Sequence, residues 1–174
     1  YAIQAALSFL ESGDSDTALF YLKRWLIHDG ESAYLWELIG DCYLAKGSEV
    51  EAEAAWLRGQ VVRASKTVQS NAECCRKLSE LYASQGNALK AERYRGYHKY
   101  ESGRLQWRDN KVREANYELT TAAEILGDDA DVWFLLAEAQ RALNDRSAAK
   151  RSYEECLRLA PNHGRAIVGL GLVQ

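Results

Sequence analysis

Residues 36–56 read WELIGDCYLAKGSEVEAEAAW, and this stretch decides the fold of the chain. Apolar residues recur in it every three or four positions on either side of Gly47, a pattern that predicts two amphipathic helices joined by a short turn. Gly40 and Ala52 fall where two such helices would cross, and their small size lets the backbones approach to about 8 Å. Large side chains such as Trp56 then fill the space around the crossing. The stretch therefore predicts an antiparallel helical hairpin.

The same pattern returns at intervals of 34 residues. An aromatic residue, a glycine, an alanine and a bulky apolar residue occur twice with this spacing, as Phe9, Gly13, Ala18 and Leu22 and again as Tyr43, Gly47, Ala52 and Trp56. Downstream, a second register pairs Asn110, Ala115, Leu119, Ala122 and Gly127 with Asn144, Ala149, Tyr153, Cys156 and Pro161. A lone hairpin leaves one apolar face uncovered, so we expect each repeat to be stabilised by stacking on its neighbours.

This period and the residues that carry it resemble a known family. The series Trp36, Ile39, Gly40, Tyr43, Gly47, Ala52 and Trp56 is similar to the W, L, G, Y, G, A, F pattern of the tetratricopeptide repeat (TPR). The resemblance implies an all-α fold, a right-handed TPR-type superhelical solenoid of antiparallel helical hairpins. It also implies binding rather than catalysis, with ligands held in a concave groove lined by the first helix of each hairpin.

Hydrophobic periodicity, turn residues and N-cap residues together predict ten helices. We expect them at about residues 1–12, 15–28, 33–46, 49–66, 69–85, 88–108, 111–126, 129–142, 145–159 and 164–174. Turns are marked by pairs such as Gly13-Asp14, Asp29-Gly30 and Lys46-Gly47, and Pro161 ends the helix before the last because proline cannot continue the hydrogen-bond ladder.

The middle of the chain departs from the regular spacing. Gly47 finds its counterpart 39 residues on at Gly86, and the next counterpart, Asn110, follows only 24 residues later. One long irregular helix at about 88–108, which would serve as the second helix of one hairpin and the first helix of the next, accounts for both intervals. The predicted organisation is therefore two TPR hairpins in 1–64, an irregular long-helix region with a degenerate TPR in 65–109, TPR helices in 110–163, and the first helix of a further repeat or a C-terminal cap in 164–174.

The last segment is more apolar than a capping helix, because Ile167, Val168, Leu170, Leu172 and Val173 crowd into it. We therefore expect further repeats in the natural protein, and we expect this last helix to pack on an adjacent chain or to fray. The chain also lacks Met and starts within a repeat, so we expect it to be a fragment whose targeting segment is missing. A cytoplasmic location is favoured, and a periplasmic one stays open.

Bulk composition narrows the classes of partner. The formal charge of −3 gives no basic excess of the kind that phosphate backbones require, so we expect no direct nucleic-acid binding. No transmembrane segment is expected either, since no run of about 18 apolar residues occurs. The expected partner is a protein or peptide.

No catalytic or metal-binding signature is present. His28, His98 and His163 are scattered, and no zincin, nucleophile-elbow or phosphate-loop pattern occurs. The four cysteines include no C-x-x-C pair, and we expect them to be structural thiols. Cys74 and Cys75 point about 100° apart on a helix, which predicts that at most one of them is buried. We expect neither enzyme activity nor a cofactor.

In the first two repeats, the TPR resemblance lines the concave groove with Ile3, Gln4, Leu7, Leu10 and Glu11, and then with Tyr34, Glu37, Leu38, Asp41 and Leu44. That surface is apolar and acidic, and it would suit an amphipathic helix or extended peptide with hydrophobic anchors and Lys or Arg flanks. The alternative interpretation is an ordinary solvated helix face.

Two later segments supply further candidate partner-binding residues. Aromatic and basic side chains alternate in 93–108, and the spacing of Tyr97, Tyr100, Arg104 and Trp107 places much of this set on one helical face, for contact either with a partner or with neighbouring helices. In the last full repeat, the resemblance places Phe134, Glu138 and Arg141 in the groove, followed by Arg165 and Val168.

One TPR subtype captures the carboxylate terminus of heat-shock chaperones with Lys, Asn and Arg residues on consecutive first helices. At the matching positions this chain has Ile3, Leu7, Leu38, Asp131 and Leu135, so we expect no such clamp. The favoured function is a non-catalytic scaffold that binds a partner peptide or protein in the concave groove of a TPR array within a larger assembly. The alternative is a periplasmic TPR segment of a bacterial exopolysaccharide secretion system that contacts the polysaccharide or its processing enzyme.

Overall fold

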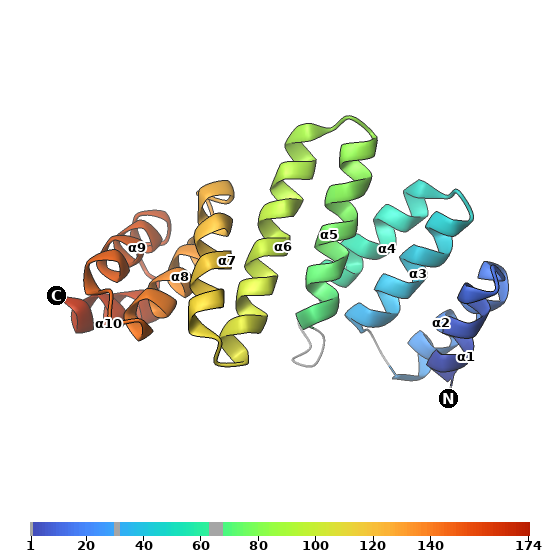
Figure 1. Cartoon of the computed structure of the whole chain (residues 1–174), viewed down its shortest axis with the longest axis horizontal. Coiled ribbons are helices and arrows are strands. Elements are labelled where there is room, and N and C mark those ends of the chain that lie inside the picture. Colours follow the sequence, from blue (N-terminus) through green and yellow to red (C-terminus); the bar gives the residue numbers. More distant parts are fainter. Residues whose placement is uncertain (1, 30–31, 63–67) are drawn as a thin grey trace. The chain divides into compact units, whose positions relative to one another are not determined.

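A computed structural model describes residues 2–29, 32–62 and 68–174 (Figure 1). All regular secondary structure in these residues is helical. The helices are α1 (Ala2–Glu11), α2 (Ser15–Asp29), α3 (Ala33–Ala45), α4 (Glu49–Val61), α5 (Val68–Ser84), α6 (Ala88–Arg108), α7 (Val112–Ile125), α8 (Ala130–Ala142), α9 (Arg146–Leu159) and α10 (Gly164–Val173). None of the described helices combines the length and apolar character needed to cross a membrane.

The chain forms two compact units, Tyr1–Ala91 and Glu92–Gln174. In the first unit, α1 pairs with α2 and α3 pairs with α4, and α5 packs against α3 and α4. In the second, α7 packs on α8, α8 pairs with α9, and α10 packs mainly on α9. We call α1, α3, α5, α8 and α10 first helices and α2, α4, α7 and α9 second helices, according to their place in a hairpin.

Close contact between a small residue and a bulky one fixes the helix crossings. A Cβ atom at Gly40 on α3 would overlap the indole of Trp56 on α4, and that indole nitrogen donates a hydrogen bond of 3.2 Å to the carbonyl oxygen of Glu37. In the second unit, a Cβ at Gly169 on α10 would overlap the ring of Tyr153 on α9. Trp56 and Tyr153 are 2% and 0% exposed, so each ring is a core residue.

Five helix-to-helix turns share one geometry. Gly13, Gly47, Gly86, Asn110 and Asn144 all have positive φ, between 60° and 82°. After each of them, the next backbone N–H bonds to the carbonyl five residues earlier, as from Ser48 to Tyr43 and from Lys111 to Gln106, the Schellman pattern that closes a helix. The two asparagines occupy the position of the three glycines because Asn tolerates the left-handed region better than most residues.

The long central helix lies between two of these turns, and its residues contact different neighbours in each unit. In the first unit, Ser79 of α5 donates a hydrogen bond of 2.8 Å to the carbonyl oxygen of Ala91. In the second unit, Gly96 and Gly103 of α6 leave no room for a Cβ beside Leu126 and Leu119. The turns at Gly86 and Asn110 lie at the two ends of α6, so the length of this helix sets the 24-residue interval between them. The 39-residue interval runs from the turn at Gly47 to the turn at Gly86.

The helix predicted at 49–66 ends at Val61, and 63–66 lie outside the described residues. The reason is Asn71, a buried residue of α5 whose amide nitrogen lies 2.8–2.9 Å from the carbonyl oxygens of Gly59, Gln60 and Val62. These carbonyls are satisfied by a side chain instead of by further helix. The other predicted bounds agree within one or two residues, and Gly30 of the Asp29-Gly30 turn lies outside the described residues.

The expectation that only one of Cys74 and Cys75 is buried is wrong, since both are 0% exposed. Helix α5 contacts α3 and α4 and also reaches Ala91 of α6, so side chains that point 100° apart are both covered. Burial raises the pKa of Cys42 to about 11 and that of Cys74 to about 12. The thiols therefore behave as small core residues.

We predict that all four cysteines resist thiol reagents in the folded protein, because the reactive thiolate is disfavoured by burial. Labelling with 5,5′-dithiobis(2-nitrobenzoate) at mildly alkaline pH should be at least about tenfold slower than in urea. The same chain in urea serves as the control. A thiol that reacts at the unfolded rate under native conditions would contradict this burial.

Candidate partner-binding surfaces

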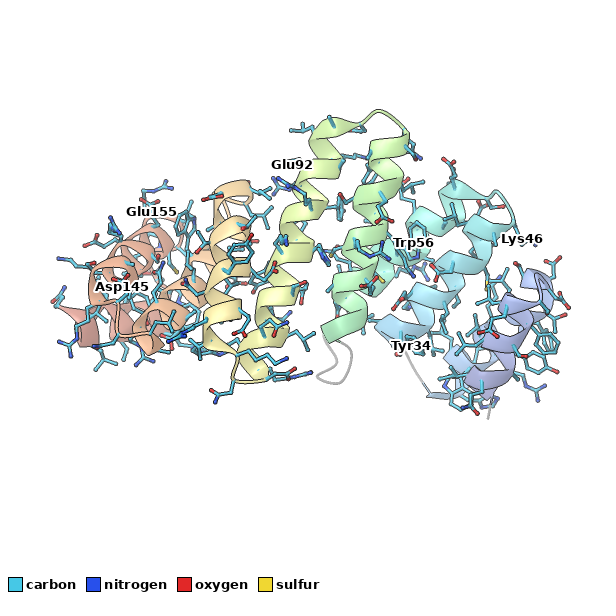
Figure 2. The ribbon with its side chains drawn as sticks, in the orientation of Figure 1. Tyr34, Lys46, Trp56, Glu92, Asp145 and Glu155 are labelled. Carbon is cyan, nitrogen blue, oxygen red and sulfur yellow. The ribbon has the colours of Figure 1, made fainter. Side chains whose placement is uncertain are left out.

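The first unit has a hollow of about 340 Å³ between the first helices α3 and α5, which we call the α3/α5 hollow. Trp56 of α4, already placed at the helix crossing, lies at its base, and Figure 2 labels this residue together with Tyr34 on α3. The other lining residues come mainly from α3 and α5: Asp41, Leu44, Glu49, Arg76, Lys77, Glu80, Leu81 and Ser84.

Lys77 neutralises the acidic residues predicted for this surface. Its ammonium nitrogen lies 3.0 Å from a carboxylate oxygen of Glu37 and 2.7 Å from one of Asp41, and its side chain is only 15% exposed. Burial lowers the pKa of Lys77, but the hydrogen bond and charge of Asp41, together with those of Glu37, outweigh burial and leave the pKa raised. The contacts of Lys77 with Glu37 and Asp41 therefore stabilise the fold at a pH below the pKa of an unfolded lysine, about 10.4. This contribution is lost as the pH rises through the raised pKa of Lys77 in the folded protein.

The four predicted residues of α3 differ in their surroundings. Glu37 and Asp41 face Lys77, Tyr34 packs half-buried against the core of the first unit, and Leu38 is itself a core residue with 6% exposure. Leu38 therefore offers little surface to a partner. The sequence analysis did not identify Lys77. The 39-residue spacing from Gly47 to Gly86 nevertheless gives Lys77 the same repeat position on α5 that Leu38 has on α3.

The aromatic residues predicted on α6 pack against other helices. Tyr97, Tyr100 and Trp107 lie partly buried on the apolar cluster that α7 and α8 build. Burial raises the pKa of Tyr100 to about 12, an effect that the nearby charge of Arg104 opposes. The three rings therefore contribute to the packing of the second unit, and only their exposed parts are available to a partner.

Arg104 is also engaged within the chain. Its guanidinium lies 5.7 Å from the ring centre of Tyr100 and 2.6 Å from a carboxylate oxygen of Glu101, which is 4% exposed. A buried carboxylate needs a compensating charge, and Arg104 supplies it. Partner contact by Tyr97, Tyr100, Arg104 and Trp107 stays a prediction.

The second unit brings the other predicted residues together. Phe134, Glu138 and Arg141 of α8 line one hollow of about 350 Å³, the α8/α10 hollow, with residues of α10. The α10 residues are Gly164, Arg165, Val168, Gly169 and Leu172. Arg165 and Val168 were expected beside this surface. Leu172 was not, although it follows Val168 by one helical turn.

Of the charged residues in the α8/α10 hollow, Glu138 and Arg141 form an ion pair with each other, whereas Arg165 lies on an aromatic ring. Burial raises the pKa of Glu138, but hydrogen bonds from Arg141 and Tyr153 and the charges of Arg141 and Arg165 outweigh burial and leave it lowered. The guanidinium of Arg165 stacks 4.6 Å from the ring centre of Phe134 and has no ion pair with a carboxylate among the described residues. Val168 and Leu172 are 65% and 62% exposed. The hollow thus offers apolar surface beside Arg165, a cation that forms no ion pair among the described residues.

A metal site has no support in this geometry. Within 2–29, 32–62 and 68–174, no three His, Cys, Asp or Glu side chains are grouped closely enough to hold an ion.

The helical hairpins place the chain in the class of α-helical repeat proteins. Two models described as tetratricopeptide repeat match the sequence, one over residues 3–67 and the other over residues 130–163, and together they cover more than half of the chain. The chain belongs to the tetratricopeptide repeat family. Members of this family are generally non-catalytic, and the matches support a role as a protein-interaction scaffold.

Three solved structures are among those similar to this chain. The TPR2AB domain of yeast Sti1, solved in its pHSP90 complex, is 13% identical over 99% of this chain and 81% of that chain, with a TM-score of 0.50. MamA is 17% identical over 97% and 81% of the two chains, and YrrB, a TPR protein with an unusual peptide-binding site, is 15% identical over 96% and 89%, each with a TM-score of 0.46. At 13% identity the likeness to the Sti1 domain shows the fold alone. No curated protein matches the sequence.

We predict that Lys77→Met lowers the free energy of unfolding by about 1–3 kcal/mol, because it leaves the carboxylates of Glu37 and Asp41 close together without a cation. Urea unfolding measures the change. Lys150→Met is the matched control, since Lys150 lies 4.0 Å from Glu154 at an exposed site and should contribute little. Adding Glu37→Gln and Asp41→Asn to Lys77→Met should restore most of the loss. Equal stability of Lys77→Met and Lys150→Met would contradict the role of Lys77.

Proposed function

We propose that the chain is a non-catalytic scaffold that binds a segment of a partner protein along its first-helix faces and holds it within a larger assembly. The observation that carries this proposal is the α8/α10 hollow. There, exposed Val168 and Leu172 lie beside Phe134 and Arg165, and the guanidinium of Arg165 stacks on the Phe134 ring. Exposed apolar side chains gathered around a cation are the features of a peptide-binding site rather than of an ordinary solvated face.

The charges in this hollow indicate the chemistry of the bound segment. Glu138 is already compensated by Arg141 and by the hydroxyl of Tyr153, so it has little need of a further cation. Arg165 is held on the face of Phe134, a placement that leaves its N–H groups available for a carboxylate. The segment that fits best carries an aliphatic or aromatic side chain next to Asp or Glu.

The α3/α5 hollow of the first unit differs from the α8/α10 hollow in how its charges are compensated. Without Lys77, the acidic residues of α3 would favour Lys or Arg flanks, as the sequence suggested. With Lys77 in place, most of that charge is compensated inside the protein, and we propose that this hollow contributes shape and apolar contact more than charge selection. Contacts by Tyr34, Glu37, Leu38 and Asp41 with a partner stay predictions.

The polysaccharide alternative has no specific support. It relied on an open aromatic and basic face on α6, and Tyr97, Tyr100 and Trp107 pack on the cluster of α7 and α8.

We predict that peptides selected from a random phage-displayed library on the whole chain share an apolar residue beside Asp or Glu. Arg165→Gln and Val168→Ser should each weaken a selected peptide by about tenfold, which corresponds to about 1.4 kcal/mol, because each removes one of the two kinds of contact. Fluorescence polarisation with the labelled peptide measures the affinities.

Ile167→Ser is the matched control for this experiment. Ile167 lies on the same helix and is 52% exposed, but it does not line the hollow. It should leave the affinity unchanged. Selected peptides that bind Arg165→Gln and Val168→Ser as tightly as the original chain would overturn the proposed site.

A further inference from the structure

Each unit has a second hollow, on the side formed by its second helices. In the first unit, a hollow of about 280 Å³ lies between α2 and α4 with α3 beneath it, the α2/α4 hollow. In the second unit, a hollow of about 470 Å³ lies between α7 and α9 with α8 beneath it, the α7/α9 hollow. Neither shares a lining residue with the α3/α5 or α8/α10 hollow.

The two second-helix hollows are equivalent sites. Every residue that lines the first has a counterpart 97 positions later that lines the second, the same interval that separates Gly47 from Asn144 in the hairpin turns. The pairs are Lys23 and Thr120, Leu26 and Ala123, Trp36 and Trp133, Ile39 and Leu136, Tyr43 and Gln140, Glu51 and Ala148, Ala54 and Arg151, Ala55 and Ser152, and Arg58 and Glu155.

The equivalent sites have opposite charge. The α2/α4 hollow is bordered by Lys23 and Arg58 with a single carboxylate, Glu51. The α7/α9 hollow contains three carboxylates and a single cation: Glu124, Glu154, Glu155 and Arg151. The backbone framework repeats, whereas the charge at the rim is reversed.

The two cations of the α2/α4 hollow are held on aromatic rings and not by acids. The guanidinium of Arg58 lies 4.8 Å from the ring centre of Trp36, and the ammonium of Lys23 lies 5.3 Å from that of Tyr43. No carboxylate among the described residues forms an ion pair with either cation. In the equivalent hollow, by contrast, Glu155 already lies 2.8 Å from Arg158. Stacking on a ring positions a cation while leaving its N–H donors open to a ligand.

Beneath these cations the hollow is apolar. Leu26, Ile39, Ala54 and Ala55 line it with the faces of Trp36 and Tyr43. Its volume is near the lower end of ligand pockets, about 300 Å³, which suits an anchoring side chain of a peptide better than a whole cofactor. Two cations are also few for a nucleic-acid backbone, which is bound by a broad basic surface.

We propose that the α2/α4 hollow is a second docking site, separate from the α3/α5 and α8/α10 hollows, for a protein segment that places an aliphatic or aromatic side chain in the hollow and Asp or Glu beside Arg58 and Lys23. The equivalent α7/α9 hollow rejects the same segment because its rim carries the wrong charge. Each unit therefore has a hollow between first helices and another between second helices, and the two second-helix hollows differ in charge.

The test uses the whole chain and the fluorescein-labelled peptide GSEDLWDELSGS. The variant Lys23→Thr with Arg58→Glu gives the first hollow the residues of its counterpart, and Lys111→Thr with Arg146→Glu makes the same charge change at exposed positions that line no hollow. Because the α8/α10 hollow takes a segment of the same chemistry, the comparison is made in an Arg165→Gln background. In that background, we expect the acidic peptide to bind the chain without further changes and the Lys111/Arg146 variant equally, and to bind the Lys23/Arg58 variant at least about tenfold more weakly. Equal affinity for the two variants would overturn the proposal, and so would the absence of binding to the original chain.

A cross-linking measurement locates the site without any variant. The same peptide with its Trp replaced by p-benzoylphenylalanine should cross-link to residues of α2–α4, and Arg165→Gln should not reduce that yield. Cross-links found only on α8 and α10 would assign the peptide to the α8/α10 hollow and refute the second site. Tight binding of oligo(dT) that is abolished in the Lys23/Arg58 variant, without peptide binding, would show a nucleic-acid surface instead.

Discussion

The structure depends on close helix crossings in which a bulky side chain of a second helix meets a very small residue of a first helix. Gly40 against Trp56 and Gly169 against Tyr153 are the tightest examples, and in both no Cβ could be added without moving the ring. Ala137, the counterpart of Gly40, belongs to the same cluster as Tyr153 and is also fully buried. Because these contacts occupy the sides of the helices that face each other, the remaining sides are left to form hollows.

The same crossings explain why each unit has two kinds of hollow. First helices that flank a second helix leave a depression over it, as in the α3/α5 hollow above Trp56, and second helices that flank a first helix leave another on the opposite side of the hairpin. The backbone determines that these depressions exist, while individual side chains determine their charge. Substitutions at a few rim positions, such as Arg58 and its counterpart Glu155, can therefore change the charge of a hollow while the backbone around it stays the same.

Most of the fold follows from the sequence because its signals are local. Two local signals predict nearly every helix boundary to within one or two residues. They are the glycine or asparagine at each of the five positive-φ turns and the regular spacing of apolar residues. The exceptions depend on residues distant in sequence. Helix α4 ends early because Asn71 of α5 binds its last carbonyls, and Cys75 is buried because α5 has neighbours on more than one side.

The candidate sites are less predictable for the same reason. The resemblance placed Phe134, Glu138 and Arg141 on one surface, and the structure brings them into one hollow with Arg165 and Val168. The resemblance could not show that Lys77 on α5 neutralises the charges of Glu37 and Asp41 on α3. Ion pairs between helices depend on which side chains the facing helix supplies. Nor could the resemblance distinguish a partner surface from internal packing for Tyr97, Tyr100 and Trp107, because interleaved rings and cations suit both roles.

Urea unfolding of Gly40→Ala tests the central claim most directly. The added methyl group has no space beside the Trp56 indole, so the account predicts a loss of about 1–3 kcal/mol in the free energy of unfolding. Gly171→Ala, at a helical position with nothing within 4 Å of the new methyl group, should leave stability unchanged or raise it by up to about 1 kcal/mol. If Gly40→Ala is as stable as Gly171→Ala, the close crossing does not hold the hairpin together and the account is wrong.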